Sequence, residues 1–175
     1  LTTSARMEEA TAKEKESGYW YVYVDGDGTR HYFRRKSEGV NEFVDEDGLG
    51  LTITTNLSYI NLKDKEGNLT SFNQTFRGGQ LSFIKDSDGN TMQFKYIGAP
   101  SGEQVLYQVI DGAGRTTALS HGFGAGDEYA RLNYIESPDG EYTYFEYADG
   151  SAPTALTKIK YPDGTYTQYQ YDGDG

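Results

Sequence analysis

The sequence contains no cysteine. Disulfide frameworks, thiolate metal sites and cysteine nucleophiles are therefore excluded. It has no apolar run of about 18 residues, the length that a membrane-spanning helix needs, and no signal peptide is visible. Basic residues are scarce, since 16 Lys and Arg stand against 27 Asp and Glu, which gives a net charge of −11 at pH 7. A charge of this sign repels nucleic acids and anionic membranes at long range, so neither is expected as a partner.

Aromatic residues and glycines are abundant instead. The 175 residues include 16 Tyr, 8 Phe and 22 Gly but only 2 Met. Aromatic side chains pack well on pleated sheets, and glycine serves tight turns. This balance favours an all-β protein.

One short pattern recurs seven times between Tyr19 and Tyr171: an apolar residue, two spacers, an apolar residue, an acidic turn with glycine, and a further apolar residue. The turn glycines, spaced 19 to 26 residues apart, are Gly28, Gly48, Gly67, Gly89, Gly114, Gly140 and Gly164. Eight positions before them stand Trp20, Val40, Tyr59, Leu81, Leu106, Leu132 and Leu156. Five positions before them stand Tyr23, Phe43, Leu62, Ile84, Val109, Ile135 and Ile159. Five positions after them stand Phe33, Ile53, Phe72, Phe94, Leu119, Phe145 and Tyr169. Such a recurrence indicates a repeat array in which each unit buries its apolar side chains against its neighbours.

The turns predict consecutive antiparallel β-hairpins. In the first hairpin, the strand run Tyr19–Val24 leads into the turn Asp25–Gly28, and the chain returns over residues 29–35. An Asp in such a turn accepts backbone N–H bonds, and the Gly takes the positive φ angle. The segments between hairpins vary in length and are predicted to be loops.

The spacing of the apolar pair before each turn leaves two possibilities open. Leu132 and Ile135, for example, are three residues apart, and in a regular strand such side chains point to opposite faces. Either a β-bulge lies between the two residues, or the first of them lies in the bend that enters the strand.

Residues 1–17 differ from the rest of the chain and form the first of two predicted regions. The stretch from Met7 to Glu16 is rich in helix-forming residues, and Ser4 is a candidate N-cap. Few apolar residues are available to hold a helix in place, so we expect a short helical or frayed segment. Residues 18–175 form the second region, a β domain of about seven hairpins that we expect to be truncated at its C-terminus.

The later repeats resemble a known family. The segments Leu132–Gly140 and Leu156–Gly164 look like the Leu-x-x-Ile and Pro-Asp-Gly core of Rhs/YD repeats. Tyr169-Gln170-Tyr171-Asp172 resembles the Tyr-x-Tyr-Asp signature that gives YD repeats their name, and Tyr147–Gly150 is a near match with one inserted residue. The resemblance covers about residues 18–175, and the first two units diverge most.

The resemblance implies both a fold and a role. In this family, which includes bacterial wall-associated proteins, Rhs polymorphic toxins and teneurins, the repeats form a twisted, open, solenoid-like sheet that spirals into a hollow shell. The bacterial shell commonly encloses a C-terminal toxin domain. By this resemblance we expect a non-enzymatic structural segment of a large secreted or cell-surface bacterial protein, whose partners are the rest of the parent chain and an enclosed toxin module. The autoproteolytic motif of the family is not visible here, so no catalytic residue is carried over.

Two acidic turns begin like calcium-binding loops. They are Asp25-x-Asp27 and Asp86-x-Asp88-x-Asn90, but the EF-hand pattern demands Gly at the sixth position, where Arg30 and Thr91 stand. Plain hairpin turns are the preferred interpretation, because the same turns recur elsewhere with Pro in place of the first Asp. No metal and no cofactor is predicted.

His31 and His121 are the only histidines. Ser120 directly precedes His121, and neighbouring side chains of a strand point apart, which does not suit a nucleophile and its base. A structural or surface role is therefore predicted for both histidines. A pair of carboxylates for glycoside hydrolysis stays a further possibility, although no Glu stands out from the repeat.

The tyrosines leave a second function open. Those that alternate along the predicted strands can form an exposed strip that stacks on sugars. The candidates are Tyr19, Tyr21, Tyr142, Tyr144 and Tyr166. Packing across strands is the competing interpretation. The alternative function is therefore a carbohydrate-binding module for cell-surface glycans.

Overall fold

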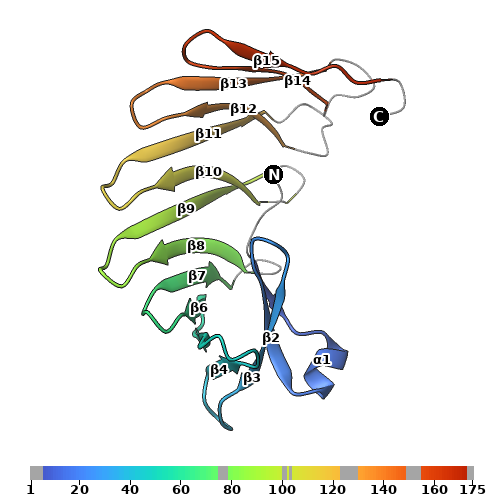
Figure 1. Ribbon diagram of the computed structural model, residues 1–175, viewed down its shortest axis with the longest axis vertical. Coiled ribbons are helices and arrows are strands. Elements are labelled where there is room, and N and C mark those ends of the chain that lie inside the picture. Colours follow the sequence, from blue (N-terminus) through green and yellow to red (C-terminus); the bar gives the residue numbers. More distant parts are fainter. Residues whose placement is uncertain are drawn as a thin grey trace. The chain divides into compact units, whose positions relative to one another are not determined.

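The protein is almost entirely β-sheet (Figure 1). The computed structural model describes residues 6–74, 79–99, 102, 104–122, 130–148 and 155–172. These residues form one open sheet of fifteen strands that follow one another in sequence order, and the paired strands are antiparallel. The predicted all-β class, built from consecutive antiparallel hairpins, is confirmed.

The bounds of the strands follow the repeat pattern. They are β1 (Arg6–Glu9), β2 (Tyr19–Val24), β3 (Arg30–Arg35), β4 (Glu42–Asp45), β5 (Thr52–Thr55), β6 (Tyr59–Lys63), β7 (Leu69–Asn73), β8 (Gln80–Lys85), β9 (Thr91–Gly98), β10 (Gln104–Ile110), β11 (Thr116–Gly122), β12 (Arg131–Glu136), β13 (Tyr142–Tyr147), β14 (Leu156–Lys160) and β15 (Tyr166–Gln168). The described part of the chain has a single helix, α1 (Ala12–Glu16). The chain divides into two compact units, residues 1–93 and 94–175, called unit 1 and unit 2 below.

Each of the seven repeat glycines stands in the turn of a hairpin and has a φ angle between +74° and +96°. Six of the turns share one hydrogen-bond pattern, illustrated by the β2–β3 turn. Asp25 donates its N–H to the carbonyl of Thr29 and accepts the N–H of Gly28. This is a type I turn followed by a glycine in the left-handed conformation, a common three-residue hairpin connection. The β4–β5 turn is longer and joins Asp45 to Leu51.

A β-bulge explains the odd spacing of the apolar pair before the turn. In β12, the pairing with β11 passes from Tyr134 to Leu132 and skips Asn133. The same skip occurs in β8 at Ser82 and in β14 at Thr157. The extra residue brings the Leu and the Ile of the Leu-x-x-Ile pattern onto one face of the sheet. Of the two possibilities left open by the sequence, the bulge is the one that these three strands adopt.

Unit 1 encloses a core made by at least one side chain from each of its first seven strands. These buried residues are Met7, Tyr21, Phe33, Phe43, Ile53, Ile60, Leu62 and Phe72. Leu81 of β8 packs against them. A Cβ atom placed on Gly79, just before β8, would lie 3.3 Å from the Cβ of Met7 in β1. The sheet of unit 1 therefore curls until its first strand meets its eighth.

The N-terminal segment is helical only in part. Thr11 caps α1 with a capping box, because its hydroxyl accepts the N–H of Glu14 at 3.3 Å and its N–H donates to the Glu14 carboxylate at 2.7 Å. The predicted cap, Ser4, lies outside the described residues. Residues 6–9 form strand β1 instead of helix, since Met7 is fully buried in the core of unit 1. The prediction from composition rested on helix propensity, which does not show that one apolar residue, Met7, is buried in the core.

Unit 2 buries only in part the face that unit 1 encloses. Apolar residues of five successive strands occupy this face and are only partly buried; they are Val109, Leu119, Ile135, Phe145 and Ile159. The pairing of Leu119 with Ile135 and of Phe145 with Ile159 places neighbours of this row on one face. Among the described residues of unit 2, only Ala99 is buried. We call these five residues the apolar row of unit 2.

Candidate functional site

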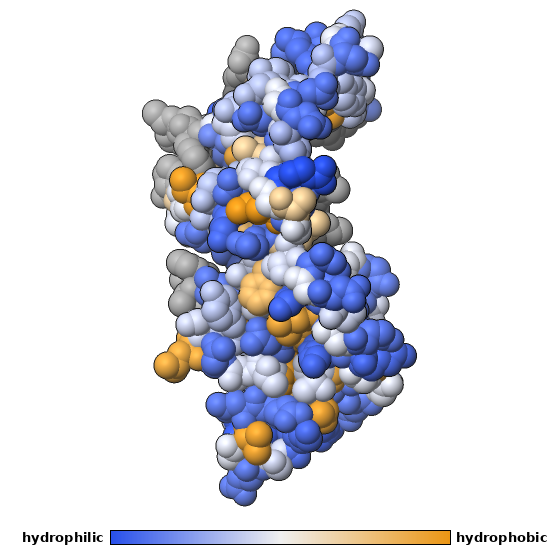
Figure 2. Space-filling view, turned by 90° about the vertical axis from the view of Figure 1, so that its left-hand side faces the viewer, coloured by the Kyte–Doolittle hydropathy of each residue, from blue (hydrophilic) through white to orange (hydrophobic). Residues whose placement is uncertain are grey.

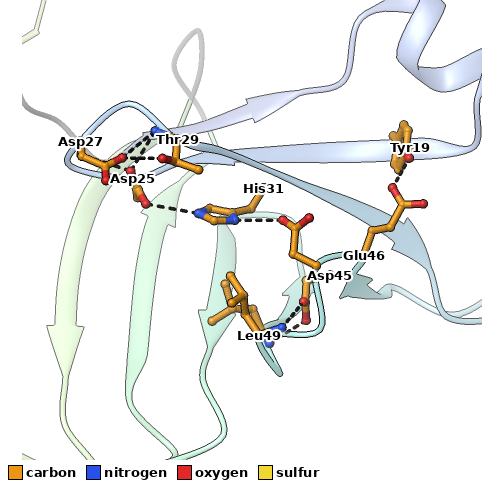
Figure 3. Close-up of polar contacts among 10 residues, drawn as sticks. Tyr19, Asp25, Asp27, Thr29, His31, Asp45, Glu46 and Leu49 are labelled. Atoms are coloured by element: carbon orange, nitrogen blue, oxygen red, sulfur yellow. Dashed lines mark hydrogen bonds and ion pairs between the residues drawn. The ribbon is translucent and has the colours of Figure 1, made fainter.

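A polar cluster in unit 1 lies between two hairpin turns (Figure 3). His31 of β3 is only 9% exposed. Its Nε2 atom lies 3.2 Å from the Asp25 carboxylate in the β2–β3 turn, and its Nδ1 atom lies 3.1 Å from the Asp47 carboxylate in the β4–β5 turn. We call these three residues the His31 clasp. Burial disfavours the charged imidazole, but the hydrogen bonds to Asp47 and Asp25 outweigh it and raise the pKa of His31.

Turn geometry positions the carboxylates of the clasp. Asp25 uses its other oxygen to accept the N–H groups of Asp27 and Thr29, at 3.1 and 3.0 Å. Asp27 in turn accepts the hydroxyl of Thr29 at 2.6 Å. The hydrogen bond from the Thr29 hydroxyl, with further hydrogen bonding within the turn, lowers the pKa of Asp27 to about 2. Both acids of the first calcium-like motif are thus engaged in turn hydrogen bonds.

The second calcium-like motif has the same arrangement. Asp86 accepts the N–H groups of Asp88 and Asn90 and the side-chain amide of Asn90, at 3.0, 2.8 and 2.8 Å. The amide of Asn90 is the main cause that lowers the pKa of Asp86. Among the residues that the structure describes, no three acidic or histidine side chains are placed to hold a metal ion together.

Adjacent turns of unit 1 are also linked by an asparagine. Asn68, at the end of the β6–β7 turn, donates its side-chain amide to Asp64 at 2.7 Å. Its carbonyl oxygen accepts the N–H of Ser87 in the β8–β9 turn at 3.1 Å. Side chains of the turns therefore join one hairpin to the next, at Asn68 as at the His31 clasp. Nothing in the repeat pattern signals these contacts, because the residues involved differ from one turn to the next.

The structure separates the two N-terminal members of the tyrosine strip. The pairing of β2 with β3 skips Trp20, so Tyr19 lies opposite Arg34 while Tyr21 lies opposite Phe33. Tyr21 is buried in the core of unit 1. Tyr19 is half-buried, and its hydroxyl is hydrogen-bonded to Glu46 and Arg34. The bulge therefore sends these two tyrosines to different faces of the sheet.

The other three candidates lie on one face of unit 2. Cross-strand pairing aligns Tyr134, Tyr144, Lys160 and Tyr166 in a row across β12 to β15. Tyr142 stacks on Tyr144 with ring centroids 5.8 Å apart, and Tyr134 lies within 6 Å of both rings. Tyr144 is 46% exposed and Tyr166 is 58% exposed. We call Tyr134, Tyr142, Tyr144 and Tyr166 the tyrosine face. The sequence argument omitted Tyr134, although it directly precedes Ile135 in β12 and therefore points to the face opposite the apolar row.

Charged side chains accompany the tyrosine face. Lys158 places its ammonium group 4.1 Å from the ring centroid of Tyr166. Lys160 forms an ion pair with Glu146. A hydrogen bond with Glu136 raises the pKa of the Tyr142 hydroxyl. The face thus combines exposed aromatic rings with acidic and basic groups, the composition that polar ligands with apolar faces favour.

The second histidine has a different environment. His121 of β11 lies opposite Leu132, while Ser120 lies opposite Tyr134. Burial lowers the pKa of His121. The Ser120 and His121 side chains face different neighbours, and they do not form a common site.

The face of the molecule drawn in Figure 2 is mostly hydrophilic, with apolar side chains scattered among polar ones. The described residues include no helix with the length and apolarity needed to cross a membrane. No protein-family model matches the chain, and no curated protein matches it.

Proposed function

We propose that the chain is a structural segment of a large secreted or cell-surface bacterial protein of the Rhs/YD-repeat type. In this role it forms part of a β-shell that encloses or displays a C-terminal toxin module. The proposed role is non-enzymatic and needs no cofactor. Its partners are the remaining repeats of the parent chain and the enclosed module.

The observation that carries the proposal is the different burial of one repeat position. Phe33 and Phe145 both stand five residues after a turn glycine. Phe33 is fully buried inside unit 1, while Phe145 in the apolar row of unit 2 is only partly buried. An apolar stripe that the unit buries only in part is a surface that another part of a larger assembly can cover. A shell wall has such a face.

The regularity of the hairpins supports the same role. Seven hairpins repeat one turn glycine with positive φ, and three of them repeat one bulge. In repeat proteins of this kind, stability comes from neighbouring units, so identical local devices extend a scaffold. The distinctive residues of the pattern turn the chain or pack it.

The test uses the gene that encodes the chain. The proposal expects further strand-and-turn repeats and a C-terminal module in the same reading frame. In that parent protein, deletion of residues 18–172 should expose the C-terminal module to limited proteolysis, while the intact protein protects it. A reading frame without further repeats, or equal proteolysis of the two proteins, would contradict the proposal.

The tyrosine face supports an alternative function, a carbohydrate-binding surface. Exposed tyrosine rings stack on the apolar faces of sugars, and neighbouring charged groups bind hydroxyls. Tyr144 and Tyr166 are the exposed rings that such stacking would use. Tyr19 and Tyr21 are engaged within unit 1 and are not part of this alternative.

A glycan array followed by calorimetry separates the two functions. The binding alternative expects one glycan class to bind and expects Tyr144→Ala or Tyr166→Ala to weaken that binding at least tenfold. Tyr107→Ala, which removes an exposed tyrosine of β10 outside the tyrosine face, is the matched control. An array without reproducible binding would eliminate the alternative and leave the structural proposal intact.

A further inference from the structure

The His31 clasp has a feature that neither proposed function uses. One imidazole, nearly excluded from solvent, contacts two carboxylates that belong to different hairpin turns. Asp25 follows β2, and Asp47 lies between β4 and β5. The ring is thus a link between two turns that are separate in sequence, as Figure 3 shows.

We propose that the His31 clasp is a proton-dependent fastener, which holds the β4–β5 turn against the β2–β3 turn when His31 is protonated and loosens that attachment when His31 is neutral. The proposal does not rest on the structural role or on glycan binding. It concerns only unit 1.

The reason is the number of protons on the ring. A protonated imidazole donates from both nitrogens, whereas a neutral imidazole donates from one and carries a lone pair on the other. Both partners of His31 are carboxylates, which accept hydrogen bonds when ionised. In the neutral state, one of the contacts at 3.1 and 3.2 Å therefore sets a lone pair against a carboxylate oxygen. Only the protonated ring satisfies both turns.

The surroundings of the ring favour the proton. Asp25 and Asp47 contact the ring directly, and Asp27 in the same turn as Asp25 also acts on it electrostatically. Tyr23 of β2 stacks beside the ring with centroids 5.9 Å apart. Burial, with the nearby Asp25 charge, raises the pKa of the Tyr23 hydroxyl, so this group is neutral where His31 titrates. The charged groups that face His31 from these elements are thus all carboxylates.

The direction of the pH effect follows from the raised pKa of His31 in the folded protein. A group with a raised folded pKa stabilises the fold fully below its unfolded pKa, which is about 6.5 for histidine. That stabilisation is lost as pH rises through the folded pKa. The clasp is therefore closed in mildly acidic solution and loosens toward alkaline pH.

The first test is an NMR titration of the two histidine rings in the whole chain. His31 should titrate at higher pH than His121, whose pKa is lowered by burial. Asp47→Asn should shift the midpoint of His31 downward and leave that of His121 in place. Asp47 is half-exposed and in a turn, so this variant should fold. A His31 midpoint at or below that of His121, or unmoved by Asp47→Asn, would overturn the proposal.

The second test measures opening of the β4–β5 turn. The amides of Leu49 and Leu51 donate to Asp45. After correction for intrinsic exchange rates, these amides should be less protected from hydrogen exchange at about pH 8.5 than at about pH 5.5, on either side of the range in which histidine titrates. His31→Gln should abolish this difference, and His121→Gln should keep it. Protection that does not change with pH in the unmodified chain, or that still changes in the His31→Gln variant, would refute the fastener.

Discussion

At the scale of single residues, each hairpin depends on a glycine that accepts a left-handed backbone conformation. The first turn shows the requirement most clearly, because it contains two glycines. Gly28 has a φ of +92°, while Gly26 is not among the glycines of positive φ. Open space surrounds a Cβ atom built on either residue. The two positions therefore differ in backbone conformation and not in crowding.

This pair gives a matched test of the turn. We expect Gly28→Ala to destabilise unit 1 by about 1–2 kcal/mol, the strain of an L-residue in the left-handed region. Gly26→Ala should be neutral or slightly stabilising, since it only restricts the unfolded chain. Urea unfolding followed by the fluorescence of Trp20, the single tryptophan, measures both. Equal midpoints for the two variants would show that the turn does not need its glycine.

The turn aspartates should make the protein less stable at low pH; we call this part of the pH–stability curve the acid limb. Hydrogen bonds from turn residues lower the pKa values of Asp64, Asp86 and Asp163, and that of Asp27 to about 2. A carboxyl group whose pKa is lowered in the folded state stabilises the fold above its ordinary pKa of about 3.9. That stabilisation is lost as pH falls through the folded pKa, so we expect the urea midpoint of unfolding to drop as pH is lowered from about 4 to 2.

Asp86→Asn tests this origin of the acid limb. The variant should show a shallower loss of stability below about pH 4, because an amide cannot be protonated there. Asp88→Asn, whose residue contributes its backbone N–H to the same turn, is the control and should keep the full acid limb. Identical acid limbs for the unmodified chain and Asp86→Asn would argue against the turn carboxylates as the cause.

At the scale of secondary-structure elements, the hairpins share one local structure but differ in how far their apolar residues are buried. An apolar or aromatic residue stands at the fifth position after each turn glycine. In β3 that residue is Phe33, and in β13 it is Phe145. Unit 1 curls over the first and buries it, while unit 2 leaves the second partly exposed.

The energetic contrast follows from burial. Phe33→Ala should destabilise unit 1 by about 3–5 kcal/mol, because it leaves a cavity in a closed core. Phe145→Ala should destabilise unit 2 by about 1 kcal/mol, since a partly buried ring loses only part of its transfer free energy. Trp20 fluorescence reports the first loss, and hydrogen exchange of residues 130–148 reports the second. A greater loss from Phe145→Ala would mean that the apolar row is already covered.

Local sequence patterns were sufficient to predict the hairpins. They were not sufficient to predict the contacts between residues that are distant in the sequence. Gly140 and its neighbours carry a turn signal within five residues, so the sequence predicts where β12 and β13 meet. Met7 becomes a strand residue only because seven other strands close around it, which no local window contains. The His31 clasp depends on two turns that the curl brings together. Tyr19 and Tyr21 lie on different faces of the sheet because Trp20 between them is left out of the pairing with β3. A simple alternation pattern does not reveal this bulge.

At the scale of the whole molecule, the two units use one sequence pattern in two ways. Unit 1 completes its own core with eight buried side chains. Unit 2 presents the corresponding stripe as the apolar row and has no large buried side chain among its described residues. The first unit can therefore be stable by itself, whereas the second gains from any surface that covers its row.

Amide hydrogen exchange, resolved by peptide, tests this difference most directly. In the chain alone, peptides from residues 19–74 should exchange more slowly than those from residues 104–122, 130–148 and 155–172. In a longer polypeptide that contains the flanking repeats, the unit 2 peptides should slow down while those of unit 1 stay unchanged. Protection of unit 2 that equals or exceeds that of unit 1 in the chain alone would contradict the account.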